Sequence, residues 1–323
     1  MMTKWSIGLF MWFTIALNAY AAAGRPAGSE PFNAGETILH HVANNSNEPI
    51  IALNKVMGID FSITKHVFML LLVAAVVFFV VTWIVRRRLK QGDAAAFKPG
   101  TALEWLVEYI RDSIVLPNVG AKWVKTWTPL VLTIFVFVFT ANIMGLIPIF
   151  DVLKLANHWI FNAGHDSVFG RLLEGGTTVT ANFNVTAALA LVTFIAIIIG
   201  GSKAHGFINH WKNIVPHGLP RPIYIILIPI EIMGMFIKPF ALTMRLAANM
   251  TGGHIAILAL LSLIFLLTEI LKNAVLGVAV GFLVSLPLAV GVSGLELIVV
   301  LIQAYVFTLL TSVFIGLVIN VHH

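Results

Sequence analysis

Apolar residues occur along the chain in long runs that are separated by short polar segments. A helix rises about 1.5 Å per residue, and the hydrocarbon core of a bilayer is about 30 Å thick, so a run of about 20 apolar residues can cross it. The pattern therefore predicts three upright membrane-spanning helices, at roughly 66–85, 128–150 and 183–201.

Two further apolar runs, at 223–267 and 274–321, are too long for one upright span each. A continuous helix of about 45 residues would measure roughly 68 Å. Each run therefore forms either one steeply tilted helix or two spans. The candidate break points are Pro239 and Gly252-Gly253 in the first run, and Pro287 and Gly291 in the second. The polar segment 268–273 is predicted to be the turn between the two runs.

Residues 101–114 show a different pattern, in which apolar positions recur at helical spacing. One face carries Leu103, Leu106, Val107, Ile110 and Ile114, and the other carries Glu104, Glu108, Arg111 and Asp112. Thr101 and Glu104 have the spacing of a capping box. We expect an amphipathic helix that lies on the cytoplasmic surface or against a partner.

The N-terminal segment resembles an export signal. Residues 1–23 contain a lone Lys4, then an apolar stretch of about a dozen residues, then Ala21-Ala22-Ala23 as a candidate cleavage site. The alternative is an additional membrane-spanning helix. Residues 24–65 are then an outer-side segment, and residues 66–323 form the membrane domain.

The amino-acid composition also indicates a membrane protein. The chain is 59% hydrophobic and 11% charged with a mean hydropathy of +0.95, whereas soluble domains carry about 25% charged residues. We therefore predict an all-α polytopic membrane protein. The sequence contains no cysteine, which excludes disulfides and thiolate chemistry.

Basic residues report topology rather than nucleic-acid binding, because they are few and lie mainly between the apolar runs. The cluster at 86–90 follows the first span at once, so that span is predicted to run from outside to inside. Lys122 and Lys125 place the amphipathic helix inside, and residues 202–222 return to the inside. The loop at 151–182 has balanced charge and is assigned to the outer side.

The long apolar runs contain ionisable residues at regular spacing. Glu231, Lys238 and Arg245 are seven residues apart, so successive members turn by only about 20° around a helix, and Asn249 follows one turn later. Glu296 and Gln303 form a second polar stripe in the second run. Because a charge near the bilayer centre costs about 2.5–3.5 kcal/mol, such residues are candidates for function.

Structural explanations compete with functional ones for several of these residues. Lys238 could reach an interface if the helix ends at Pro239. Glu231 could pair with Arg245 only if the helix breaks, because 14 residues of helix separate them by about 21 Å. By default, Asn249 and Gln303 would form hydrogen bonds between helices.

Two further alternatives concern His254 and Glu296. His254 lies about half a turn away from Arg245 in azimuth and could be a neutral core histidine bonded to a carbonyl. Glu296 could pair with Lys272 or His254 as a structural contact.

Two strings carry a specific resemblance. "MRLAANMTGGHI" and "GLELIVVLIQAYVFTLLTSVFIG" closely resemble segments of subunit a of F-type ATP synthases, and "LTIFVFVFTANIMGLIP" and "ANFNVTAALAL" resemble its earlier helices. The likeness covers roughly residues 60–320. It implies that the two long runs form a tilted helical hairpin facing a ring of c subunits. It also implies a static, non-catalytic subunit that moves protons to and from the carboxylates of that ring through two half-channels.

The resemblance assigns roles residue by residue. Arg245 matches the family's essential arginine, which separates the half-channels, and Asn249 and Gln303 match polar residues near it. His254 and Glu296 match a carboxyl–imidazole pair, which we assign to the outer half-channel. Glu231 matches a position that is often acidic and is a candidate for the inner half-channel or its mouth.

The same resemblance implies the surroundings of the chain. The expected partners are the c-subunit ring, the b-subunit peripheral stalk, other ATP synthase subunits and the lipid bilayer, with no cofactor, metal or nucleic acid. The expected location is the bacterial inner membrane, with the N-terminus outside and the C-terminus in the cytoplasm.

Other functional classes explain the sequence less well. A secondary ion-coupled transporter could also have long helices with buried charges, but it predicts inverted repeats, and the sequence shows none. An intramembrane hydrolase would need a nucleophile with its base or a motif such as H-E-x-x-H, which the sequence lacks. A structural scaffold would leave Arg245 unexplained.

Overall fold

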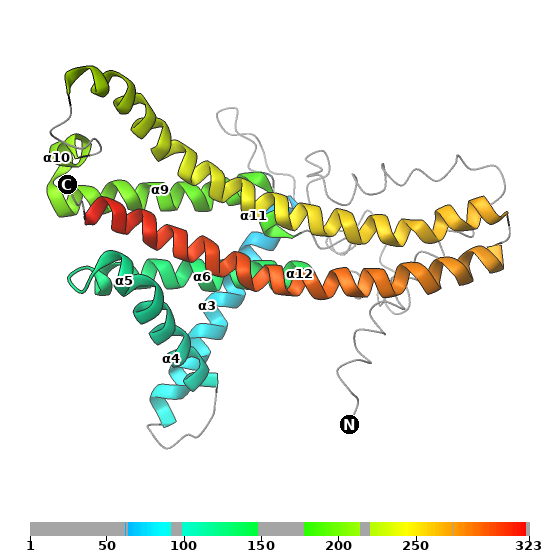
Figure 1. The fold of residues 1–323 in the computed structure, drawn as a ribbon. Helices are drawn as coiled ribbons and strands as arrows, with labels where there is room; N and C mark the ends of the chain where they lie inside the picture. Colours follow the sequence, from blue (N-terminus) through cyan, green and yellow to red (C-terminus); the bar gives the residue numbers. More distant parts are fainter. Residues whose placement is uncertain are drawn as a thin grey trace. The chain divides into compact units, whose positions relative to one another are not determined.

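The computed structural model describes residues 62, 64–91, 99–147, 178–213, 220–272 and 274–320, and every regular element in these ranges is a helix (Figure 1). Among them, five helices are long and apolar enough to cross a membrane, by length and composition. They are α3 (Lys65–Gln91), α6 (Val124–Leu146), α9 (Phe183–His205), α11 (Arg221–Leu271) and α12 (Ala274–Ile319). The predicted all-α polytopic membrane fold is confirmed.

The predictions for the N-terminal region and the outer loop fall largely on other residues. The expected signal peptide at 1–23, nearly all of the segment 24–65 and most of the loop 151–182 lie outside the described ranges. These assignments therefore stay predictions.

The two long helices are unbroken. α11 contains 51 residues and continues through Pro229 and Pro239, and α12 contains 46 residues and continues through Pro287. The alternative in which each run divides into two spans is therefore wrong. At about 1.5 Å per residue the helices measure roughly 76 and 69 Å, so they fit a bilayer only when steeply tilted. The turn between them is also shorter than predicted, because α11 extends to Leu271 and α12 begins at Ala274.

The chain divides into two compact units, and the first contains the tip of the hairpin. It comprises Met1–Leu71, Asn142–Ala181 and Asn249–Val299. Within it, the end of α11 and the start of α12 run antiparallel in close contact. A methyl group added at Gly281 would lie 2.8 Å from the Cα atom of Ile264, so the glycine permits this approach.

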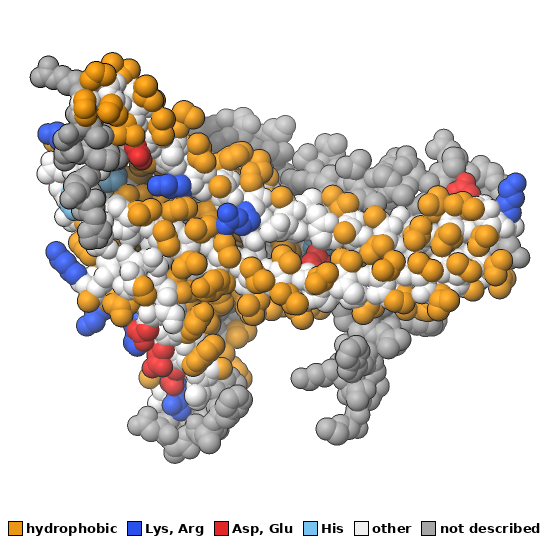
Figure 2. Space-filling model, in the orientation of Figure 1, with side chains coloured by type: hydrophobic (Ala, Val, Ile, Leu, Met, Phe, Trp, Pro, Cys, Tyr) orange, Lys and Arg blue, Asp and Glu red, His pale blue; other side chains and the backbone are white. Residues whose placement is uncertain are grey.

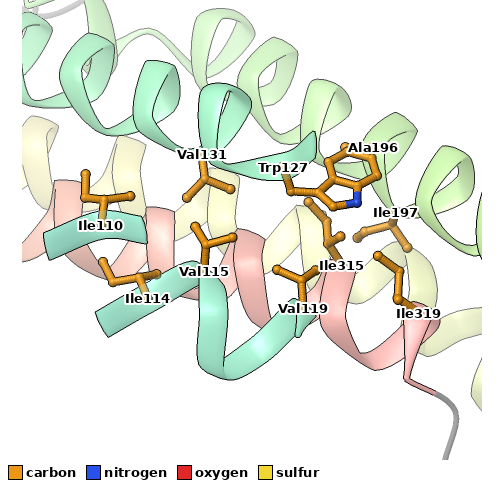
Figure 3. Close-up of a cluster of buried hydrophobic side chains, with 10 residues drawn as sticks. All are labelled: Ile110, Ile114, Val115, Val119, Trp127, Val131, Ala196, Ile197, Ile315 and Ile319. Atoms are coloured by element: carbon orange, nitrogen blue, oxygen red, sulfur yellow. The ribbon is translucent and has the colours of Figure 1, made fainter. Parts of the chain in front are cut away.

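The second unit comprises Leu72–Ala141, Asn182–Ala248 and Val300–His323, and it holds a buried hydrophobic cluster (Figure 3). The π-helix η1 (Ile110–Val115) and the short α5 (Leu116–Val119) contribute one side of the cluster, and α6, α9 and the end of α12 contribute the rest. Its members are Ile110, Ile114, Val115, Val119, Trp127, Val131, Ala196, Ile197, Ile315 and Ile319.

The segment predicted as an amphipathic helix at 101–114 consists of α4 (Pro99–Tyr109) followed by the π-helix η1. Ile110 and Ile114 are fully buried, so this apolar face packs against the rest of its own chain. A hydrogen bond joins η1 to the C-terminal part of α12, where the Ser312 hydroxyl donates to the Ile114 carbonyl over 3.2 Å.

The predicted capping box at Thr101 is wrong. α4 begins two residues earlier, at Pro99, so Thr101 lies inside the first turn. The carboxylate of Glu104 instead pairs with Arg88, whose Nε atom donates to Oε1 over 2.9 Å.

A short helix, α10 (Phe207–Lys212), follows α9. Gly206 makes the connection with a φ of 85°, a left-handed conformation that favours glycine. The chain then places His210 against Gly201 of α9, where its side chain is buried. His205, at the end of α9, lies 3.0 Å through Nε2 from the Ile319 carbonyl of α12.

Candidate functional site

The polar stripe predicted on the first long run lies on one continuous helix. Glu231 and Lys238 of α11 are half-buried, and the Lys238 ammonium lies 5.6 Å from the centre of the Phe314 ring. Because α11 does not end at Pro239, the condition for Lys238 to reach an interface there is not met. Glu231, Lys238 and Arg245 therefore follow one another along a single unbroken helix.

Arg245 lies on the exposed side of α11. Its neighbours at helical spacing, Ala241 and Ala248, are also exposed. Leu242 and Leu246 lie about 60° and 100° around the helix from Arg245 and are buried, so Arg245 lies toward one edge of the exposed face. Small residues on both sides leave the guanidinium accessible to a large approaching partner.

No ion pair in the described part of the chain involves Arg245. The alternative of a pair with Glu231 is excluded, because an unbroken helix keeps these residues about 21 Å apart. The cation is therefore not neutralised by Glu231, the nearer in sequence of the two carboxylates on its helix.

Asn249 and Gln303 have different environments. Asn249 lies one turn beyond Arg245 and is exposed, whereas Gln303 of α12 is buried with 3% of its surface accessible. The expectation that Gln303 lies near Arg245 stays a prediction.

Glu296 lies close to the backbone of α11 at the residue that precedes His254. A Cβ atom at Gly253 would overlap the Glu296 carboxylate, so the absence of a side chain there makes room for it. Only 4% of the Glu296 surface is accessible. The structure thus places Glu296 of α12 beside Gly253 of α11, the residue before His254, and a direct pairing of Glu296 with His254 stays a prediction.

The structural explanations proposed for Glu296 do not hold. Neither carboxylate oxygen has a hydrogen-bond partner within the described ranges, and Glu296 forms no ion pair there with Lys272 or His254. A buried carboxylate without a partner is costly in its ionised form. A carboxyl group in this setting is suited to binding and releasing a proton.

His254 is hydrogen-bonded to a side chain rather than to a carbonyl. Its Nε2 atom and the hydroxyl of Thr178 are partners, and no hydrogen bond from this ring to a carbonyl is found within the described ranges, so the alternative of a carbonyl-bonded core histidine has no support there. Thr178 is buried, and its side chain occupies the space where a Cβ atom at Gly145 would lie.

Thr178 begins a short turn that bridges two helices of the first unit. The 3₁₀ helix η3 (Val179–Ala181) follows it. On one side, the Thr180 hydroxyl donates to Oδ1 of Asn142 near the end of α6 over 2.6 Å. On the other side, the Thr251 hydroxyl of α11 donates to the Ala181 carbonyl over 3.3 Å.

The sequence analysis did not assign a function to Thr178, Thr180 or Asn142. Their signal is weak because hydroxyl side chains are common in loops and helices. The usable clue was the sequence Thr177-Thr178-Val179-Thr180, with three threonines in four residues shortly before the apolar run at 183–201.

Metal binding has no support in the described ranges, where no group of three or more His, Cys, Asp or Glu side chains is placed to hold an ion. Glu296 of α12 lies beside Gly253, which precedes His254 on α11, and no ion pair joins Glu296 and His254 within these ranges.

Comparisons with known proteins agree on one family. The family model described as ATP synthase A chain matches residues 67–316. A protein of Chlorobaculum tepidum named ATP synthase subunit a 2 is 38% identical over 312 residues, which cover 94% of this chain and 78% of that protein.

Two further relatives carry the name ATP synthase subunit a. The protein of Chlorobium phaeobacteroides is 38% identical over 306 residues, covering 92% of this chain and 79% of its own. The protein of Myxococcus xanthus is 35% identical over 265 residues, covering 82% and 75% respectively.

Proposed function

The chain belongs to the ATP synthase A chain family, and we propose that it is the static subunit through which protons reach and leave the c-subunit ring of the Fo sector. In this proposal the chain provides two aqueous half-channels that open to opposite sides of the membrane. Arg245 separates them. The chain itself carries out no catalytic step and serves the synthase by conducting protons.

The observation that carries this proposal is the environment of Arg245. A guanidinium keeps its proton at any working pH, so it cannot pass protons from one half-channel to the other. Its charge attracts a carboxylate strongly where water is scarce. Because Arg245 is exposed on α11 and forms no ion pair within the described ranges, it is available to a carboxylate on another subunit.

The proton route on the outer side uses Glu296 and His254. An imidazole and a carboxyl group both titrate in a range that their surroundings can adjust, which suits them to accept and release protons. Glu296 lies beside Gly253, which is the residue before His254 in the sequence. Its carboxylate has no hydrogen-bond partner among the described residues. Glu231, which is half-buried on α11, is our candidate for the inner half-channel or its mouth.

Asn249 and Gln303 are assigned to the region around Arg245. Asn249 follows Arg245 by one helical turn and is likewise exposed. Both side chains can donate and accept hydrogen bonds, so they can hydrate or orient the groups that pass the guanidinium.

The faces of α11 and α12 are well suited to lipid and to a ring of apolar helices. Figure 2 shows hydrophobic side chains over most of the visible surface of these two helices, with only a few charged ones between them. We propose that the tilted hairpin packs against the c ring, that the b-subunit stalk and other synthase subunits bind elsewhere, and that lipid covers the remaining apolar surface.

The proposed location is the bacterial inner membrane. Five crossings, one for each helix of membrane-spanning length in the described ranges, would put the start of α3 and the end of α12 on opposite sides. The arginines and lysine at 86–90 favour the cytoplasm for the end of α3. The N-terminus is then outside and the C-terminus in the cytoplasm.

Purification of the chain from its native membrane tests the proposal. A tagged chain extracted in mild detergent is expected to bring with it a ring of small subunits that each carry a carboxylate, together with the other synthase subunits. A secondary ion-coupled transporter would purify without that ring and would move a solute by itself in proteoliposomes. That second result would overturn the proposal.

A further inference from the structure

Thr178 is in direct contact with the imidazole of His254. Its hydroxyl is bonded to Nε2 of that ring. The turn makes other polar contacts as well, among them the bonds from Thr180 to Asn142 and from Thr251 to the Ala181 carbonyl. The turn is therefore held on two sides, and among the described residues the side-chain hydrogen bond to His254 comes from Thr178.

The helices are shaped to hold Thr178 in this place. Asn142 and Gly145 are three residues apart on α6 and so share a face, and Thr251 and His254 share a face of α11 in the same way. Gly145 leaves the space that the Thr178 side chain fills, because a Cβ atom there would lie 2.7 Å from the Cβ atom of Thr178. Thr178 itself is 4% accessible. Its hydroxyl has little freedom to turn toward other partners.

We propose that Thr178 is a positioning residue for proton transfer, which holds Nε2 of His254 and thereby leaves Nδ1 as the nitrogen that exchanges protons. This inference rests on the proposed role of His254 in the outer half-channel. In the arrangement we assign, the N–H at Nε2 donates to the Thr178 oxygen. Nδ1 then carries the lone pair, accepts a proton from water and returns it to the next carrier, while the bond at Nε2 stays intact.

The opposite arrangement does not suit a relay. If the Thr178 hydroxyl donated to Nε2, the neutral ring would carry its proton on Nδ1 and its only lone pair would be occupied. The ring could then accept a proton only by displacing Thr178. A hydrogen bond that favours the protonated ring also favours proton uptake, because it strengthens when the donor is charged.

The test measures passive proton flow through the assembled synthase in membrane vesicles after removal of the catalytic sector, as a function of pH on the outer side. Thr178→Val removes the hydroxyl while keeping the shape of the side chain. We expect flow roughly tenfold slower, with its midpoint moved by about one unit to lower pH, because a hydrogen bond to a charged ring is lost. Thr178→Ser keeps the hydroxyl and is expected to restore both values.

Two further variants test the mechanism by a different route. Gly145→Ala should displace Thr178 and reproduce the shift without altering either partner of the bond. Thr186→Val is the matched control, because Thr186 is also fully buried but its hydroxyl donates only to carbonyls of its own helix region. It should leave the midpoint unchanged.

A double variant separates this inference from the proposed function. In a His254→Leu background, Thr178→Val should have no additional effect, because the residue acts through the ring. If His254→Leu alone leaves proton flow unchanged, the proposed role of His254 fails. If His254→Leu slows the flow but an assembled Thr178→Val complex keeps the wild-type rate and midpoint, the inference about Thr178 is overturned.

Discussion

The substitution Gly253→Ala tests whether the position of Glu296 matters for proton transfer. The added methyl group would lie 2.7 Å from Cδ and 3.1 Å from Cγ of Glu296, and it would overlap the carboxylate itself. Ordinary contacts between such atoms begin near 3.4 Å. The carboxyl group must therefore move by about 1 Å, while its identity and its helix stay the same.

The effect of Gly253→Ala on the stability of the protein is the sum of two opposing contributions. Alanine favours an α-helix over glycine by about 1 kcal/mol, and overpacking of a filled site costs about 1–3 kcal/mol. The net change in stability is small, so we expect the complex to assemble. Misplacement of a reacting group by about 1 Å can slow its reaction on the order of 100-fold, and we expect a loss of proton flow approaching that size.

The assay is passive proton flow into vesicles that carry the synthase without its catalytic sector, followed with a pH-sensitive dye and normalised to the amount of assembled complex. Gly294→Ala is the matched control, because it lies on α12 two residues before Glu296, where an added methyl group has no neighbour within 4 Å. Flow through assembled Gly253→Ala complexes at the rate of the control would refute the reasoning that places Glu296 on the route.

Two other predictions concern Glu296 and the end of α9. Glu296→Gln keeps the shape but cannot carry a proton, so passive proton flow should fall at least about tenfold; an unchanged rate would remove Glu296 from the route. Burial, aided by nearby His205, lowers the pKa of His210 below its ordinary 6.5. Because the folded state then favours neutral His210, the docking of α10 should weaken as the pH falls below 6.5. Amide hydrogen exchange of α10, corrected for the pH dependence of the intrinsic rates, should therefore show less protection at lower pH. In the His210→Leu variant the protection of α10 should not change with pH. Protection of α10 that does not change with pH in the wild type would contradict the reasoning.

The sequence was sufficient for the class of fold, because a membrane imposes a strong and local constraint. Runs of apolar residues specify helices wherever water is absent, since every backbone group must then find a partner within its own segment. Hydropathy could not decide whether the long runs break. The proline and glycine residues, including Pro239 and Pro287, mark points where a helix can bend, and the helices continue through them.

Local detail around 99–119 was harder to predict. The apolar spacing correctly identified Ile110 and Ile114 as one face, but periodicity does not say which surface that face will cover. It covers the cluster around Trp127 and Ile315 in the same chain. The π-helix at Ile110–Val115 could not be foreseen, because its altered hydrogen bonding has no distinct sequence pattern.

The candidate site was predictable where it contains charges and not where it contains hydroxyl groups. Arg245 and Glu296 are conspicuous because charged side chains are expensive in an apolar run. Thr178 and Gly145 are conspicuous only once the chain is folded, since neither residue type is unusual in its own segment and 33 positions separate them in the sequence.

The measurement that tests the central claim most directly is ATP-driven proton pumping by the assembled synthase with Arg245→Ala, compared with the wild type in the same vesicles. The account predicts that pumping is abolished while the detached catalytic sector still hydrolyses ATP, because nothing then separates the half-channels or attracts the passing carboxylates. Normal pumping by an assembled Arg245→Ala complex would contradict the account.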